Sequence, residues 1–140
     1  MPKKPLARKM TRDEKRNLDV EIGFIEGVVR KDPSFVEALQ ILGDDYTKRG
    51  RFDDGLKVDE QLAVLRPQDA TVLYNLACSY SLTGQTEQAF DALQRSLAAG
   101  YDDFKWLAQD PDLEAVRKHP RYKEVRAQIK TSKPKAKKSV

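Results

Sequence analysis

The chain matches itself at a spacing of 34 residues, and this internal match constrains the fold more than any other feature. Seven positions that begin at residue 39 recur one spacing later. The first set is Leu39, Leu42, Gly43, Tyr46, Gly50, Gly55 and Leu62, and the second is Leu73, Leu76, Ala77, Tyr80, Gly84, Ala89 and Ser96. A period of this length with helical spacing predicts a helix–turn–helix unit that stacks on copies of itself.

Capping and stop residues divide the rest of the chain into helices. Thr11 and Glu14 form a capping box in front of a helix over about residues 12–31, which Pro33 ends. Four more helices are expected, each ending at a glycine or before a proline. The first has Ser34 as its cap candidate and runs to about Arg49, and the second runs from near Asp53 to before Pro67. The third is capped by Asp69 and runs to about Thr83, and the fourth runs from about Glu87 to Ala99. The fold class is therefore all-α, built from antiparallel helix pairs.

The sequence after residue 101 departs from the repeat. Asp102 or Asp103 is expected to cap a short helix whose Trp106 belongs to the core. A second start signal is Asp110-Pro111, a cap followed by proline at the first helical position. A last helix carries Tyr122, Val125 and Ile129.

The spacing and the repeated residues resemble the tetratricopeptide repeat (TPR) family. The resemblance implies a TPR-like α-α superhelix in a single domain over residues 11–130, with repeats at about 36–69 and 70–103. Two units leave two open ends, so capping helices are expected over 12–31 and 102–130. The first of these aligns as a lone second helix of a preceding unit. The alternative is an unrelated amphipathic helical bundle.

The C-terminal segment resembles one that follows bacterial TPR arrays, with a DPDL element and then R-x-x-P-R-Y. The residues that carry this similarity are Asp110, Pro111, Asp112, Leu113, Arg117, Pro120, Arg121 and Tyr122. The resemblance implies packing and no activity.

In the TPR family, the first helices of successive units line a concave groove that binds a peptide or partner protein. Aligned onto this chain, the resemblance implies a partner-binding groove made of Glu37, Gln40, Ile41, Asp44, Lys48, Tyr74, Asn75, Cys78, Ser81, Leu82 and Lys105. The alternative is that these side chains are merely exposed. Some members hold a partner's C-terminal carboxylates with a lysine, asparagine and arginine clamp. Gln40, Asp44 and Gln109 replace three of its residues, so we expect no clamp here.

The basic charge of the chain lies at its ends. All 22 acidic residues lie between residues 13 and 129, whereas five lysines and arginines precede this segment and five follow it. Residues 1–10 and the lysine-rich residues 131–140 are expected to be disordered tails. Such tails support an alternative function as a nucleic-acid or anionic-surface accessory protein. The simpler interpretation is that they only keep the protein soluble.

No catalytic or metal-binding motif stands out. The single cysteine, Cys78, is expected to be a small buried residue, and His119 a helix-end residue beside Pro120. Adjacent pairs such as Asp44-Asp45 are interpreted as caps and solvated faces. We therefore expect a non-catalytic adaptor without cofactor or metal, cytoplasmic, with no apolar segment long enough for membrane insertion and with self-association possible.

Overall fold

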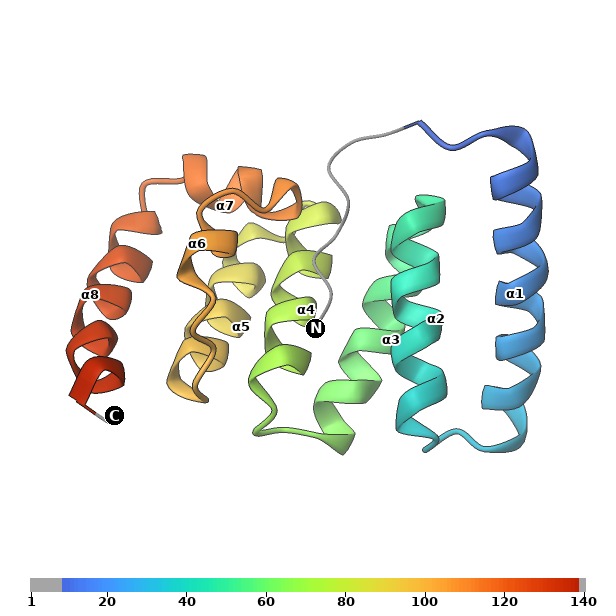
Figure 1. Ribbon diagram of the computed structural model, residues 1–140, viewed down its shortest axis with the longest axis horizontal. Helices are drawn as coiled ribbons and strands as arrows, with labels where there is room; N and C mark the ends of the chain where they lie inside the picture. The colour runs from blue at the N-terminus through green and yellow to red at the C-terminus, as the bar shows by residue number, and fades with distance from the viewer. Residues whose placement is uncertain (1–8, 139–140) are drawn as a thin grey trace.

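The computed structural model describes residues 9–138, and within this range it contains helices and no strand. The elements are α1 (Arg12–Lys31), α2 (Val36–Arg49), α3 (Phe52–Leu65), α4 (Ala70–Leu82), α5 (Thr86–Ala98), α6 (Phe104–Leu107), the 3₁₀ helix η1 (Pro111–Leu113), α7 (Glu114–Lys118) and α8 (Tyr122–Lys138). They succeed one another from α1 at one end of the molecule to α8 at the other (Figure 1). The all-α, TPR-like α-α superhelix expected from the sequence is confirmed.

The turns inside the two repeated pairs have the same backbone geometry. Gly50 ends α2 at φ 81°, and Gly84 follows α4 at φ 79°. The amide of Gly50 donates to the carbonyl of Thr47 at 3.1 Å, and the amide of Gly84 donates to that of Ser81 at 3.2 Å. Both glycines adopt the left-handed conformation that other residues rarely tolerate, which explains their recurrence at the 34-residue spacing.

A side-chain hydrogen bond also recurs at this spacing. The hydroxyl of Tyr46 donates to Glu26 at 2.5 Å, and that of Tyr80 donates to Glu60 at 3.0 Å. Glu60 lies on α3, the second helix of its pair, and Glu26 lies on α1. Helix α1 therefore occupies the place of a second helix in a preceding pair, as the alignment predicted.

Small residues allow the helices of the first pair to approach closely. A Cβ at Gly43 on α2 would lie 3.1 Å from Asp59 Oδ1 and 3.5 Å from Val58, both on α3. A Cβ at Gly55 on α3 would lie 3.4 Å from the hydroxyl of Thr47. Ala89, at the position equivalent to Gly55, is fully buried. These contacts explain why the repeat has small residues at these positions.

The apolar residues form two clusters along the stack. The cluster at the α1 end consists of Ile22, Leu39, Leu42, Tyr46, Val58, Leu62 and Val72. The larger cluster joins α4 and α5 to the C-terminal elements, and includes Phe90, Leu93, Trp106, Leu107, Leu113, Val116 and Val125. The C-terminal segment is thus part of the core and not an appendage. None of the helices within residues 9–138 has both the length and the apolar character needed to cross a membrane.

Most predicted caps are confirmed, and one is wrong. Thr11 and Glu14 form the complete capping box, and Asp69 accepts hydrogen bonds from the first amides of α4. Ser34, in contrast, does not cap α2, because Phe35 stands at the cap position and contributes no side-chain hydrogen bond. The amide of Ser34 instead lies 3.4 Å from Asp32 Oδ1, in a turn that uses up the two residues before the helix.

The C-terminal boundary differs from the prediction. We expected a disordered tail from residue 131, but α8 continues to Lys138. Lysine and alanine in this extension favour a helix whereas Pro134 opposes it, so the helix that the packed part of α8 has started continues past the proline. Residues 1–8 and 139–140, which belong to the two expected tails, lie outside the described residues.

Candidate partner-binding surface

An exposed strip of side chains follows one face of α2. It consists of Glu37, Gln40, Ile41, Asp44 and Lys48, and we call it the α2 strip. Their spacing of three, one, three and four residues keeps all five on one side of the helix. Ile41 stands in the middle and is 45% exposed, which makes it one of the few large apolar side chains that face solvent. Every α2 residue predicted for the groove is thus accessible.

The equivalent face of α4 is mostly closed. Tyr74 is 0% exposed, Cys78 is 3% exposed and Ser81 is 7% exposed. Asn75 and Leu82 are half-buried, so they are less accessible than the residues of the α2 strip. The face predicted from the alignment therefore divides into an open part on α2 and a covered part on α4, with Lys105 exposed on α6 beyond it.

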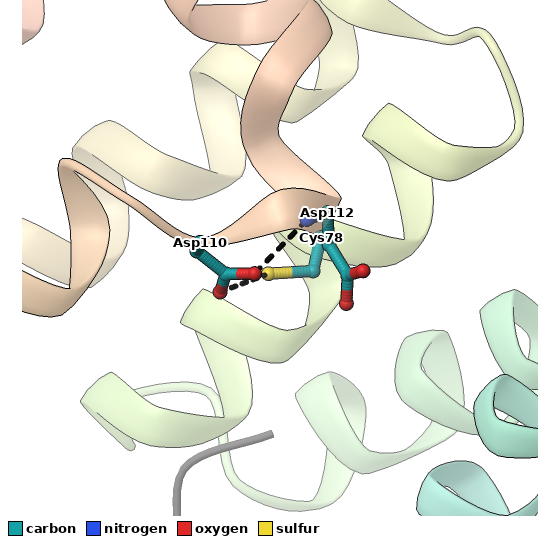
Figure 2. A group of neighbouring side chains, drawn as sticks. All are labelled: Cys78, Asp110 and Asp112. Carbon is teal, nitrogen blue, oxygen red and sulfur yellow. Dashed lines mark hydrogen bonds between the residues drawn. The ribbon is translucent and has the colours of Figure 1, made fainter. Parts of the chain in front are cut away.

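A buried hydrogen-bond network around Asp110 closes the α4 face. Asp110 is 0% exposed. Burying a carboxylate without hydrogen-bond partners costs free energy, so this side chain needs donors around it. Its Oδ2 accepts from the hydroxyl of Tyr74 at 2.7 Å and from the thiol of Cys78 at 3.7 Å, and its Oδ1 accepts from the amide of Asp112 at 3.0 Å. Figure 2 shows the carboxylate between η1 and the thiol on α4. Asp110 therefore caps η1 and anchors it to α4.

Aromatic packing extends this closure. The rings of Tyr74 and Tyr101 stack with centroids 4.1 Å apart and an interplanar angle of 6°. Burial, together with nearby Cys78 and Asp110, raises the pKa of Tyr74 far above its usual value, so its hydroxyl keeps its proton and remains a donor. Trp106 is 6% exposed, as expected for a core residue.

The side chains of Cys78, Asp110 and Asp112 place three possible metal ligands within 4.8 Å of one another. Both oxygens of Asp110 already accept hydrogen bonds, one of them from the thiol that a metal would need as a thiolate. The chemistry of this donor set fits a hydrogen-bonded anchor better than a metal centre. We therefore assign the cluster a role in packing.

The sequence did not reveal this network. The cap signal of Asp110-Pro111 was visible, and Asp110 does accept from the amide of Asp112. Its second role depends on Tyr74, which lies 36 residues away in the sequence. Tyr74 aligns with a groove position, and nothing in the sequence around it indicated that η1 would cover it.

His119 also has a structural setting. Its Nδ1 accepts from the amide of Arg121 at 3.1 Å, and its ring packs edge-to-face with that of Phe90, with centroids 5.2 Å apart. Both contacts fit the helix-end role predicted for it.

The junction of α1 and α2 contains a second buried carboxyl group. Asp45 is 3% exposed, and burial together with a hydrogen bond to Glu21 and the charge of Glu21 raises its pKa to about 7. The interpretation of Asp44-Asp45 as a solvated pair is therefore wrong for Asp45. Its side chain points into the α1–α2 junction because one residue along a helix turns the direction by about 100°.

Comparison with known proteins gives distant matches to parts of larger proteins. No family model matches the chain. It is 38% identical over 79 residues to a chloroplastic protein of Arabidopsis thaliana, covering 54% of this chain and 24% of that protein. It is 32% identical over 91 residues to the peroxisomal targeting signal receptor of Komagataella phaffii, covering 64% of this chain and 16% of the receptor.

A human relative matches in a similar way. The chain is 30% identical over 95 residues to the PEX5-related protein of Homo sapiens, covering 68% of this chain and 14% of that protein. The chain thus spans about a quarter or less of the length of these curated relatives.

Proposed function

We propose that this chain is a non-catalytic adaptor of the tetratricopeptide repeat type that binds a partner protein or peptide on the α2 strip. The observation that carries the proposal is the contrast between the two equivalent faces. The α2 strip is open, whereas Tyr74 and Cys78 on α4 are buried under η1. The helix-pair fold and the similarity to a targeting signal receptor support the same function.

The chemistry of the α2 strip indicates what a partner must offer. Ile41 supplies an apolar contact of the kind that anchors a helix or an extended peptide. Glu37 and Asp44 lie on either side of it along the helix, and Lys48 lies one turn beyond Asp44. A complementary segment therefore carries an apolar side chain with basic groups near it and an acidic group toward Lys48.

A matched pair of substitutions tests this assignment. Ile41→Glu removes the apolar centre of the α2 strip, and Val64→Glu makes the same kind of change on α3, at a residue that is 80% exposed. Tagged wild-type and variant chains are used to capture partners from the cells that produce the protein. We expect Ile41→Glu to lose a partner that the wild type and Val64→Glu both retain. Identical partner sets for all three chains would contradict the proposal.

A second candidate function follows from a basic depression at the start of α1. Its volume is about 450 Å³, and it is lined by Arg12, Lys15, Arg16, Asp19 and Arg49. Arg16 pairs with Asp13 at 2.8 Å and Arg49 pairs with Asp19 at 2.8 Å, so part of the positive charge is compensated. The depression favours the nucleic-acid or anionic-surface function that the basic ends suggested.

Salt dependence distinguishes the two functions. Binding through lysine and arginine releases counterions and weakens steeply as salt is added. If the depression binds an anionic polymer, neutralising Arg12 and Lys15 to glutamine will weaken retention on a heparin column. If the α2 strip carries the function, these substitutions will leave partner capture unchanged, and Ile41→Glu will abolish it.

A further inference from the structure

The outer face of α1 exposes two large apolar side chains. Val20 is 68% exposed and Phe24 is 70% exposed, whereas Ile22 between them is 1% exposed. Residues two apart in a helix point in nearly opposite directions, so Val20 and Phe24 face away from the α2 side that buries Ile22. In Figure 1, α1 stands at the end of the row with no described helix on its far side. This surface is separate from the α2 strip.

Val20 and Phe24 belong to a longer seam on α1. Residues spaced alternately by four and three positions fall on one side of a helix, as in a heptad repeat. This outer seam consists of Asp13, Asn17, Val20, Phe24, Gly27 and Lys31. All of them are exposed except Gly27, which is half-buried. The seam has apolar residues at its centre, an acidic residue at one end and a basic residue at the other.

Two glycines on or beside the outer seam have no packing reason within the described chain. A Cβ at Gly23 would meet nothing within 4 Å, and one at Gly27 would meet only the side chain of Arg30 at 3.7 Å. A Cβ at Gly43, in contrast, would lie only 3.1 Å from Asp59 Oδ1. Glycine is an unfavourable residue inside a helix, so two of them at open positions leave a shallow surface on which another helix can lie closely.

The outer seam is complementary to itself in antiparallel orientation. Suppose that two copies of α1 are related by a twofold axis at residue 22. A residue that lies a given number of positions before residue 22 then faces the residue that lies the same number of positions after it on the other copy. Asp13 then faces Lys31, Val20 faces Phe24, and Asn17 faces Gly27. The same contacts form twice, as a twofold interface requires. In a parallel arrangement Asp13 would face Asp13 and Lys31 would face Lys31.

We propose that the occupant of the outer seam is a second copy of this chain, and that two α1 helices pair antiparallel to form a homodimer. The apolar centre supplies the attraction. Asp13 already forms an exposed ion pair with Arg16 at 2.8 Å in its own helix, and its contact with Lys31 of the second copy adds to this pair and sets the register. A single helix face is a small interface, so the dimer is expected to be in concentration-dependent exchange with the monomer in the micromolar range. The proposal does not depend on the α2 strip, which lies on a different helix.

Sedimentation velocity on the full chain tests the proposal between about 5 and 500 µM. The wild type is expected to shift from monomer toward dimer as its concentration rises. Phe24→Glu should remain a monomer throughout, because it places a charge at the centre of the outer seam. Val64→Glu, the matched change on α3, should dimerise like the wild type. Phe24 is exposed, so its variant should keep the wild-type circular dichroism and melting temperature.

Exchanging the charges tests the antiparallel register. Asp13→Lys places like charges opposite each other twice and should weaken the dimer about tenfold. Adding Lys31→Asp to this variant should restore the dimer, because each pair then has opposite charges again.

Three outcomes would overturn the proposal. The first is a wild type that stays monomeric at every concentration, which would mean that a second copy is not the occupant of the outer seam. The second is a dimer that Phe24→Glu leaves intact. The third is a double charge variant that dimerises no better than Asp13→Lys alone. Loss of partner capture by Ile41→Glu in a chain that still dimerises would separate this surface from the α2 strip.

Discussion

The two ends of this helical stack are completed in different ways. At the C-terminal end, η1 and α7 cover α4, and Asp110, Tyr74 and Cys78 form a buried polar network. At the other end, α1 buries only its inner face, and Val20 and Phe24 remain in contact with solvent. The difference shows that a repeat unit does not determine by itself whether its surface is available. The segment that packs beside the unit determines whether its surface is exposed.

The residues at equivalent positions are adapted to these surroundings. Gln40 and Asp44 on the open face of α2 correspond to Tyr74 and Cys78 on the closed face of α4. The first two are suited to water, whereas a tyrosine and a cysteine can be buried with one hydrogen bond each. The 34-residue pattern keeps the backbone constant while these positions follow their local environment.

The largest predicted effect comes from breaking the closed end. Asp110→Ala removes the cap of η1 and leaves the buried hydroxyl of Tyr74 without its acceptor. We expect the free energy of unfolding, measured by urea denaturation, to fall by about 3–4 kcal/mol. Asp69→Ala, which removes the half-buried cap of α4, serves as the control and should cost about 1 kcal/mol. Similar losses in the two variants would mean that Asp110 is only a cap.

The α1–α2 junction should make stability depend on pH. The pKa of Asp45 is raised from 3.8 to about 7, so the folded protein holds a proton that the unfolded chain releases near pH 4. Its contribution is therefore greatest at low pH and is lost as the pH rises toward 7. Between about pH 5 and pH 8 this loss amounts to roughly 2–3 kcal/mol.

Urea denaturation across this pH range checks the prediction with two asparagine variants. Asp45→Asn should remove most of the pH dependence and be more stable than the wild type at about pH 8. Asp44→Asn, at the exposed neighbouring position, should keep the wild-type dependence. A pH profile that Asp45→Asn leaves unchanged would rule out Asp45 as the titrating group.

One substitution made at both ends sharpens the comparison directly. Val125 on α8 is 0% exposed and Val20 on α1 is 68% exposed. Val125→Ala should therefore cost about 2 kcal/mol through lost burial and a residual cavity. Val20→Ala should change the stability of the monomer by less than about 0.5 kcal/mol. Thermal and urea denaturation at low protein concentration measure both, and equal losses would show that the outer face of α1 is covered in the monomer.

The smallest predicted effect is a gain. Gly23→Ala adds a methyl group where nothing lies within 4 Å, so better helix propensity should stabilise the monomer by about 0.5–1 kcal/mol. Gly43→Ala should destabilise it, because the new Cβ would lie 3.1 Å from Asp59 Oδ1. Denaturation of dilute samples should therefore give opposite signs for the two variants. A loss for Gly23→Ala would mean that an intramolecular contact needs this glycine.

Local sequence signals predicted the repeated part of the fold well. Gly50 and Gly84 marked helix ends because their backbone angles suit glycine, and the capping box at Thr11 and Glu14 lies within one turn. The placement of α1 as a second helix could be predicted because the period extends into it, as the Tyr46–Glu26 hydrogen bond demonstrates.

The candidate site was less predictable, because it depends on contacts between distant segments. Alignment identified the first-helix faces of α2 and α4 as equivalent, but burial of Tyr74 depends on Asp110, 36 residues later. Ser34 looked like a cap because its residue type is favoured there, yet Asp32 forms the turn and shifts the helix start to Val36. In each case a hydrogen bond outside the local pattern determined the result.

The accessibility of single thiols tests the central contrast between the open α2 face and the closed α4 face. Cys78 is the chain's single cysteine, so maleimide labelling of the wild type reports on α4 alone. The variant Cys78→Ala with Ile41→Cys reports on α2. We predict that the thiol introduced at position 41 reacts at least about a hundredfold faster than Cys78, which must wait for local opening. Equal labelling rates in the two folded proteins would contradict the closed α4 face.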